Sequence, residues 1–167
     1  MTASFERGAD RVGEMEPIDA LLADEESLWH DVRDLVAAFP GDAALKPGYY
    51  EEGWSVKDAV AHIGTWLAEA GVALERIRAG TYTRAPAGPE LDEMNDRFLD
   101  AMRDVPLRDV LAQAAASRTR MRRAWVELAD PSDEALSWVA KAGPEHYREH
   151  LPRLREWLDG VRAAASA

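Results

Sequence analysis

The sequence contains no cysteine among its 167 residues. This absence excludes a disulfide framework, a cysteine-ligated zinc or iron–sulfur site and a catalytic thiol. Any metal ion must therefore be held by histidine, aspartate or glutamate. The length is that of one domain, large enough to bury a hydrophobic core without covalent cross-links.

Positive charge is scarce, because 20 Lys and Arg residues face 31 Asp and Glu residues and leave a net charge of −11. The resulting field repels phosphate backbones and anionic lipid head groups. We therefore expect no nucleic acid and no membrane among the partners. The substrate expected for the pocket described below is a small molecule.

Long apolar runs are also absent, since no segment approaches the roughly 18 consecutive apolar residues that a membrane-spanning helix needs. Residues 1–15 carry charges throughout and have the pattern of neither a secretory signal nor an anchor. The sequence therefore predicts a cytoplasmic protein whose residues 1–15 are disordered.

Apolar residues recur at intervals of three and four through most of the chain, and no alternating stretch is long enough to indicate a strand. The pattern predicts an all-α protein, namely a four-helix bundle with a crossover and one extra short helix. We assign a single bundle to residues 16–163 and a frayed tail to residues 164–167. The predicted helices cover residues 17–39, 55–79, 90–103, 106–128 and 144–161, with an irregular stretch between 132 and 143.

His146 and His150 stand four residues apart, so both rings project from one side of a helix. A helical wheel puts both beside Leu154 and Trp157 on the apolar face, which points into the bundle. A buried polar group without a partner costs roughly 1–3 kcal/mol. The pair must therefore be satisfied by hydrogen bonds, by protonation or by a cation.

His62 lies in the middle of the second predicted helix, on the flank of its apolar face beside Trp66. Helical bundles build metal sites from side chains on facing helices, such as two ligands from one helix and a third from another. We therefore predict that His62, His146 and His150 bind a divalent ion, with at least one coordination position open for water or substrate. The alternative is that all three are hydrogen-bonded core histidines.

The remaining histidine, His30, falls opposite the apolar stripe of its helix and is not expected to bind metal. Tryptophan is large and favours burial with its N–H satisfied, so tryptophans are expected in the core and in pocket walls. The residues predicted to line the pocket are Trp66, Trp157 and Tyr147.

Glu149 completes a His-x-x-Glu-His pattern, in which some metallopeptidases use the glutamate as general base. Those peptidases are much larger mixed folds with a further acidic ligand, so the pattern does not predict a peptidase here. Glu149 is either a general base or partner of the site, or a solvated carboxylate.

Pro152 either bends the last helix beside the histidines or marks its first residue. A local basic patch, read as a solvated face or an anion site, comprises Arg118, Arg120, Arg122 and Arg123.

Two segments, residues 53–63 (GWSVKDAVAHI) and 145–152 (EHYREHLP), resemble the DinB-like superfamily of small bacterial four-helix proteins. The resemblance covers about residues 17–161 and implies a bundle with a crossover and a three-histidine site for a divalent metal, which maps onto His62, His146 and His150. The start of the second helix is similar to the N-terminal domains of mycothiol-dependent maleylpyruvate isomerases. Residues 91–128, with Asn95 and Ser117, resemble the branch that contains a self-protection cyclopropane hydrolase.

The two branches imply different chemistry, which is metal-assisted thiol transfer or isomerisation in the first and hydrolysis without an evident histidine triad in the second. Because this chain keeps the triad, we expect a metal-dependent hydrolase or thiol transferase that uses Zn²⁺ or Ni²⁺ and a low-molecular-weight thiol. The resemblance also implies a homodimer. The alternatives are a metal-independent small-molecule-binding or self-protection protein and a non-catalytic dimerising helical module.

Overall fold

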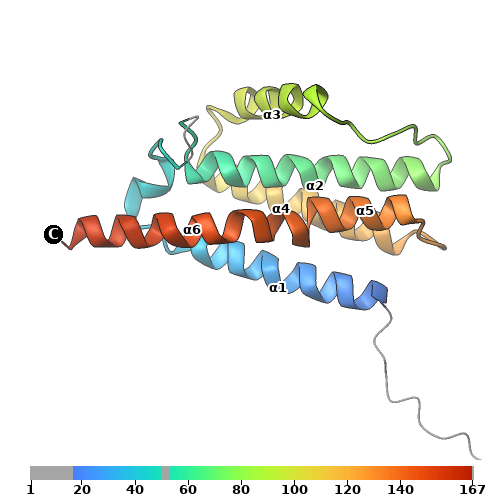
Figure 1. The fold of residues 1–167 in the computed structure, drawn as a ribbon, viewed down its shortest axis with the longest axis horizontal. Coiled ribbons are helices and arrows are strands. Elements are labelled where there is room, and N and C mark those ends of the chain that lie inside the picture. The colour runs from blue at the N-terminus through green and yellow to red at the C-terminus, as the bar shows by residue number, and fades with distance from the viewer. Residues whose placement is uncertain (1–16, 50–52, 167) are drawn as a thin grey trace, which may run out of the picture.

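The computed structural model describes residues 17–49 and 53–166, and these residues form helices and no strand (Figure 1). The predicted all-α class is therefore confirmed. The segment 1–15, predicted to be disordered, lies outside the described residues. The helices are α1 (Pro17–Ala37), the 3₁₀ helix η1 (Gly41–Leu45), α2 (Val56–Arg78), α3 (Pro89–Met102), α4 (Leu107–Val126), α5 (Asp133–Ala142) and α6 (Pro144–Ala165).

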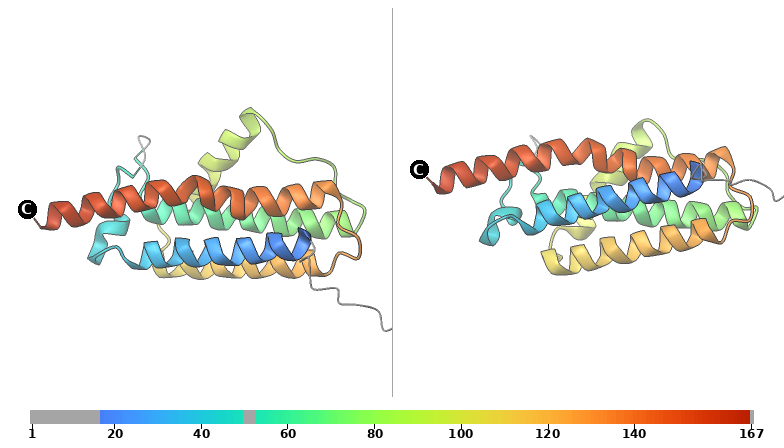
Figure 2. Two further views of the ribbon diagram at one scale, coloured as in Figure 1. Left: turned by 60° about the horizontal axis from the view of Figure 1, so that its bottom comes forward. Right: turned by 90° about the horizontal axis from the view of Figure 1, so that it is seen from below.

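The bundle has four rods that run side by side, formed by α1, by α2, by α4, and by α5 and α6 placed end to end (Figure 1, Figure 2). Along these rods α2 packs against α4, α1 packs against α6, and α5 contacts α2. The short helix α3 stands outside the four rods, on the connection from α2 to α4, and contacts α2. This arrangement is the predicted bundle with a crossover and one extra short helix.

The central helix α2 begins with a capping box, which the Ser-x-x-Asp pattern predicts. Ser55 Oγ accepts a hydrogen bond from the Asp58 N–H (3.3 Å), and the Asp58 carboxylate accepts one from the Ser55 N–H (2.8 Å). Further along, a Cβ added at Gly64 would lie 2.9 Å from the Ala114 Cβ, so the glycine allows α2 and α4 to approach closely. The buried apolar stripe of α2 includes Val56, Val60, Ile63, Leu67 and Leu74.

The stretch between residues 132 and 143 is helical, so the predicted irregular segment is wrong. Ser132 caps α5 by accepting a hydrogen bond from the Ala135 N–H (3.3 Å). Ala135, Val139 and Ala142 then follow at helical spacing and are buried. Two of these three are alanines, whose small side chains give a weak apolar signal although they fill the core.

The helix α6 runs without interruption from Pro144 to Ala165, so Pro152 lies inside the helix and does not begin it. Pro152 is exposed, and the histidines four residues apart stand on regular helix. The helix continues past the predicted end at Val161, and its C-cap is Ser166. Within the described residues, no helix has both the length and the apolar character that crossing a membrane requires.

The four arginines of the predicted basic patch all pair with carboxylates. Arg120 bonds Glu75 and Arg123 bonds Glu127 at the surface. Arg118 and Arg122 instead reach the fully buried Glu25 of α1. We call Glu25, Arg118, Arg122 and Tyr147, whose hydroxyl donates to Glu25 over 3.0 Å, the glutamate–arginine cluster.

Candidate metal centre

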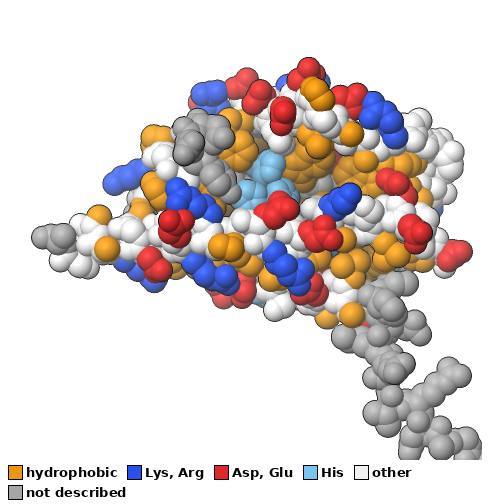
Figure 3. Space-filling model, in the orientation of Figure 1, with side chains coloured by type: hydrophobic (Ala, Val, Ile, Leu, Met, Phe, Trp, Pro, Cys, Tyr) orange, Lys and Arg blue, Asp and Glu red, His pale blue; other side chains and the backbone are white. Residues whose placement is uncertain are grey.

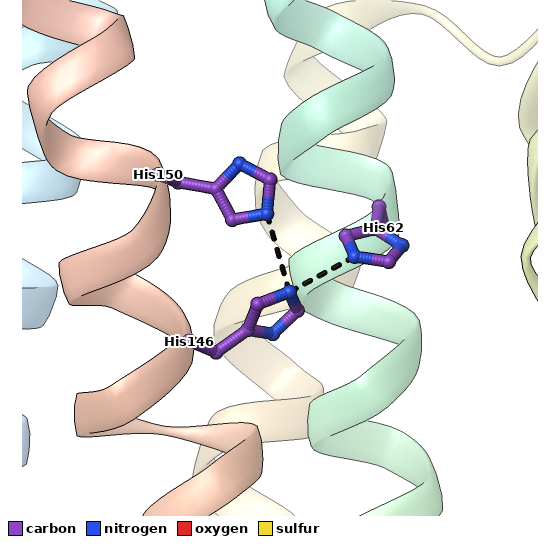
Figure 4. A group of neighbouring side chains, drawn as sticks. All are labelled: His62, His146 and His150. Carbon is purple, nitrogen blue, oxygen red and sulfur yellow. Dashed lines mark hydrogen bonds between the residues drawn. The ribbon is translucent and has the colours of Figure 1, made fainter. Parts of the chain in front are cut away.

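Three imidazole rings from two helices converge at one point between α2 and α6 (Figure 4). His146 Nε2 lies 2.9 Å from His62 Nε2 and 3.2 Å from His150 Nε2. One ring nitrogen of each residue can be chosen so that all three lie within 4.8 Å of one another. We call His62, His146 and His150 the histidine cluster.

Two of the three pairwise separations match nitrogens that share a small cation, and they equally match hydrogen bonds between the rings. With zinc–nitrogen bonds of about 2.05 Å, two ligands are about 3.3 Å apart in tetrahedral and about 2.9 Å apart in octahedral geometry. The distances of 2.9 and 3.2 Å between facing Nε2 atoms fall near both values. The donor set therefore fits a divalent transition metal, and imidazole suits zinc and nickel alike.

Burial keeps the three rings uncharged. His146 and His150 are 7% and 6% exposed. Burial, with a contribution from His150, lowers the pKa of His62 from 6.5 to about 3, and burial lowers the pKa of His150 to about 4. The pKa of His146 is also well below its usual value, through burial first and then through the other two rings. Neutral rings offer the lone pairs that a metal ion needs.

Hydrogen bonds among the three rings leave the cluster incomplete. The Nδ1 atoms of His62 and His146 are buried and have no partner at full hydrogen-bonding geometry among the described residues, although the Ala142 backbone lies close enough to His146 to oppose the lowering of its pKa. Whichever tautomer each ring adopts, the shared contacts at Nε2 cannot also satisfy these outer nitrogens. Three neutral rings cannot all use their inner lone pairs in hydrogen bonds to one another. A cation at the centre would accept all three lone pairs at once.

The histidine cluster borders a cavity of about 530 Å³. Figure 3 shows histidine side chains in a hollow that is flanked by hydrophobic side chains. The cavity is bounded by α2, α3, α5, the start of α6 and the loop before α3. Its lining comprises His62, Trp66, Ala85, Pro86, Leu91, Asn95, Glu134, Ser137, Trp138, Lys141, Ala142, His146 and Glu149.

The structure brings Trp66 and Glu149 to this cavity together with His62 and His146. Glu149 is exposed, so its carboxylate can meet solvent as well as a bound molecule. His30 lies elsewhere, exposed on α1 and paired with Glu26 over 3.2 Å.

Tyr147 and Trp157, predicted as pocket residues, do not line the cavity. Tyr147 is next to His146 and so points about 100° away around the helix, toward Glu25. Trp157 shares the face of His146 but lies 157 − 146 = 11 residues later, about 16 Å along the helix axis. There it packs edge-on against Tyr49, with Arg153 over its ring.

Sequence reasoning did not single out several residues near the cluster as site residues. The Trp54 ring stands edge-on to the His62 ring with centroids 5.3 Å apart. Trp138 and Lys141 line the cavity from α5, the helix that was predicted as irregular. Their spacing of three residues would have placed both on one helical face if α5 had been recognised.

The model of the family described as "Mycothiol maleylpyruvate isomerase N-terminal domain" matches residues 26–165 of this chain. No curated protein matches the sequence. The fold is similar to the crystal structure of an uncharacterised protein from Escherichia coli UTI89, with a TM-score of 0.73 and 13% identity. That similarity covers 87% of this chain and 94% of the other, and at this identity it supports the fold alone.

Proposed function

The chain belongs to the mycothiol maleylpyruvate isomerase N-terminal domain family, and from this premise we propose that it is a divalent-metal-dependent enzyme acting on a small molecule. The reaction is hydrolysis or thiol transfer, and the metal is zinc or nickel. One observation carries the proposal, namely that three neutral imidazoles converge beside a cavity of about 530 Å³, which His62 and His146 line.

In this proposal the histidines and the cavity wall have separate roles. His62, His146 and His150 hold the ion, and their neutrality leaves its charge undiminished. A divalent ion held there supplies Lewis acidity, which lowers the pKa of a water or thiol enough to provide a nucleophile near neutral pH. Trp66 forms part of the apolar wall of the cavity beside these groups.

Glu149 is the candidate proton carrier. Its carboxylate lines the cavity and follows one turn of helix after His146, so it can reach a molecule bound beside the histidine cluster. A positioned carboxylate of this kind accepts or returns a proton as bonds change. We therefore expect Glu149→Gln to retain the metal and lose turnover.

Thiol transfer is the branch that the family name supports, since that name includes a thiol cofactor, mycothiol. A low-molecular-weight thiol is accordingly the proposed co-substrate. Thiolate is a soft ligand that zinc and related ions bind well, so it suits the open coordination position.

The test is elemental analysis of protein purified without a nickel column. We expect about one divalent ion per chain after loading and dialysis, and loss of that ion in His62→Ala and in His146→Ala. His30→Ala is the matched control, because it removes an exposed histidine that lies outside the cluster. Protein that takes up no ion and is equally stable in chelator would instead support the metal-independent binding protein or the non-catalytic module.

A further inference from the structure

Asn95 is the single asparagine of the chain, and it lines the same cavity as His62 and His146. It stands on α3, the crossover helix outside the four rods of the bundle. Its side chain is half-buried, with Oδ1 accepting a hydrogen bond of 2.9 Å from Trp66 Nε1. The crossover helix α3, which lies outside the four rods, thus places a polar side chain in the wall of the histidine cavity.

The Trp66 contact determines which way the Asn95 amide faces. An indole N–H can only donate, so the atom beside it must be the amide oxygen. The amide nitrogen then occupies the other position and carries two N–H donors. Within the described residues this nitrogen makes no hydrogen bond. Asn95 therefore presents oriented donors that the fold itself does not use.

The helix that carries Asn95 is anchored at two points. Phe98, one turn further on, stands edge-on to the Trp66 ring with centroids 5.9 Å apart. Lys57 Nζ donates to the backbone carbonyls of Met102 and Arg103, each over 3.0 Å, and so holds the end of α3 against the start of α2. Donors on an anchored helix keep a defined position, which recognition of one substrate atom requires.

Other polar groups of the cavity are not oriented in this way. Lys141 is exposed and makes no hydrogen bond or ion pair with another described residue. Glu134 is occupied, since its carboxylate accepts a hydrogen bond of 2.7 Å from Tyr82. Asn95 is accordingly a neutral donor whose orientation is already set by a hydrogen bond to a neighbouring side chain.

We propose that Asn95 is a substrate-binding residue that donates a hydrogen bond to a carbonyl oxygen, and that Trp66 is its positioning residue. This inference rests on the proposed function and adds a substrate class to it, namely small molecules with a ketone, ester, thioester or amide carbonyl beside the group that meets the metal. A carbonyl oxygen only accepts hydrogen bonds, so it matches the donor pair of the Asn95 amide.

The experiment uses the full chain loaded with Co²⁺, whose visible absorbance reports thiolate binding. Two probes of similar size and shape are titrated, 4-mercaptobutanamide, which has a carbonyl, and 4-methylpentane-1-thiol, which has none. Three methylene groups separate the thiol from the carbonyl, which disfavours a chelate in which both bind the same ion. The measured quantity is the ratio of their dissociation constants. Relative to the Asn95→Leu variant, we expect the wild-type protein to favour the carbonyl probe by a further factor of about five, the value of one neutral hydrogen bond.

The variants decide whether Asn95 causes that preference. Asn95→Leu should lower the preference for the carbonyl probe about five-fold, and Asn95→Asp, which replaces the donors with a carboxylate, should lower it further. Trp66→Phe keeps an aromatic ring and removes the orienting N–H, so an intermediate ratio is expected. Asp96→Asn is the control, because this exposed neighbour on α3 should leave the ratio unchanged. Circular dichroism and Co²⁺ stoichiometry verify that each variant is folded and loaded.

Two failures remain distinguishable. If Co²⁺ does not bind, or binds equally to the His62→Ala variant, the metal site and the proposed function are overturned, and the Asn95 inference falls with them. If Co²⁺ and both thiols bind but the ratio is the same in Asn95→Leu as in the wild type, the metal site stands and the role of Asn95 alone is overturned.

Discussion

His146 and Tyr147 are neighbours on α6, but their side chains belong to two buried polar clusters on different sides of that helix. His146 points toward α2 and the other two histidines. Tyr147 points toward α1, where its hydroxyl donates to Glu25. The same helix therefore serves two polar clusters, and these clusters differ in what they still require.

Within the glutamate–arginine cluster, the charge and the hydrogen-bonding groups of Glu25 are matched by its protein partners. Arg118 binds the Glu25 carboxylate with two hydrogen bonds of 2.7 and 2.8 Å, and Arg122 and Tyr147 bind it as well. Opposite charges and matched donors offset most of the cost of burial. These contacts link α1, α4 and α6, so the cluster acts within the fold.

The histidine cluster has only bases and no counter-charge. Three neutral rings face one another, and two of their outer nitrogens have no partner among the described residues. Such a group contributes little to the fold by itself and would gain stability from the cation that we propose it binds. The comparison indicates that a buried polar cluster that is incomplete without a ligand marks a functional site, whereas a complete one marks a structural site.

Acid should distinguish the two clusters most strongly. The folded-state pKa values of His62 (about 3) and His150 (about 4) lie below the ordinary 6.5. In the presence of a chelator, the free energy of unfolding should therefore be highest above pH 6.5 and should fall as the pH decreases toward 4 and 3. The reason is that in this range the unfolded chain binds protons that the folded chain does not. Each titrating histidine contributes a slope of about 1.4 kcal/mol per pH unit.

Urea unfolding at a series of pH values measures this slope. His150→Gln, whose amide does not titrate, should flatten the dependence between pH 6.5 and 4, while His30→Gln at the surface should not. An equally steep decline in His150→Gln would show that the acid sensitivity arises elsewhere in the protein.

Removing the buried carboxylate should produce the next largest effect. Glu25→Ala removes the buried carboxylate between Arg118 and Arg122 and leaves them only the part-exposed Glu26, while their side chains are only 12% and 28% exposed. Breaking a buried pair from one side costs about 3 kcal/mol at the lower end of the usual range. Denaturant unfolding at neutral pH measures this loss.

The adjacent Glu26 provides the control for that substitution. It also bonds Arg118, over 2.6 Å, but its side chain is 44% exposed. Glu26→Ala should therefore cost less than about 1 kcal/mol, as exposed ion pairs do. Equal losses in Glu25→Ala and Glu26→Ala would contradict the structural role assigned to the buried carboxylate.

Metal should stabilise the protein through the histidine cluster alone. With free zinc or nickel at 100 times its dissociation constant, the free energy of unfolding should rise by about 2.7 kcal/mol. His62→Ala should abolish this increase, and Glu25→Ala should retain it on its lower baseline. Thermal unfolding with and without metal measures the difference, and a full increase in His62→Ala would remove the basis for a three-histidine site.

The histidine cluster could be predicted from the sequence because its geometry is mostly local. His146 and His150 are four residues apart on one helix, and the apolar spacing around them shows which face points inward. The position of His62 followed from the apolar stripe of a second long helix. Helical periodicity carries this kind of information directly, and the resemblance to DinB-like proteins added that the two helices meet.

The glutamate–arginine cluster was missed because its partners are remote in sequence. Glu25 and Arg118 are 93 residues apart, and no spacing rule connects them. One signal was present, since Glu25 stands on the apolar stripe of α1 between Leu21 and Leu28, where a charge needs a buried partner. The hydrogen bond between Trp66 and Asn95 had no such signal, because it depends on how the crossover places α3 over α2.

Tyr147→Phe should have the smallest effect and tests whether the two clusters are independent. The substitution removes one hydroxyl from the Glu25 carboxylate, which keeps its arginine partners, so the loss should be about 1 kcal/mol. Metal affinity should stay unchanged although His146 is the next residue, because the phenol lies on the other side of α6. Isothermal titration calorimetry of zinc into the metal-free wild type and variant measures this affinity. A weaker metal site in Tyr147→Phe would mean that α6 couples the two clusters mechanically.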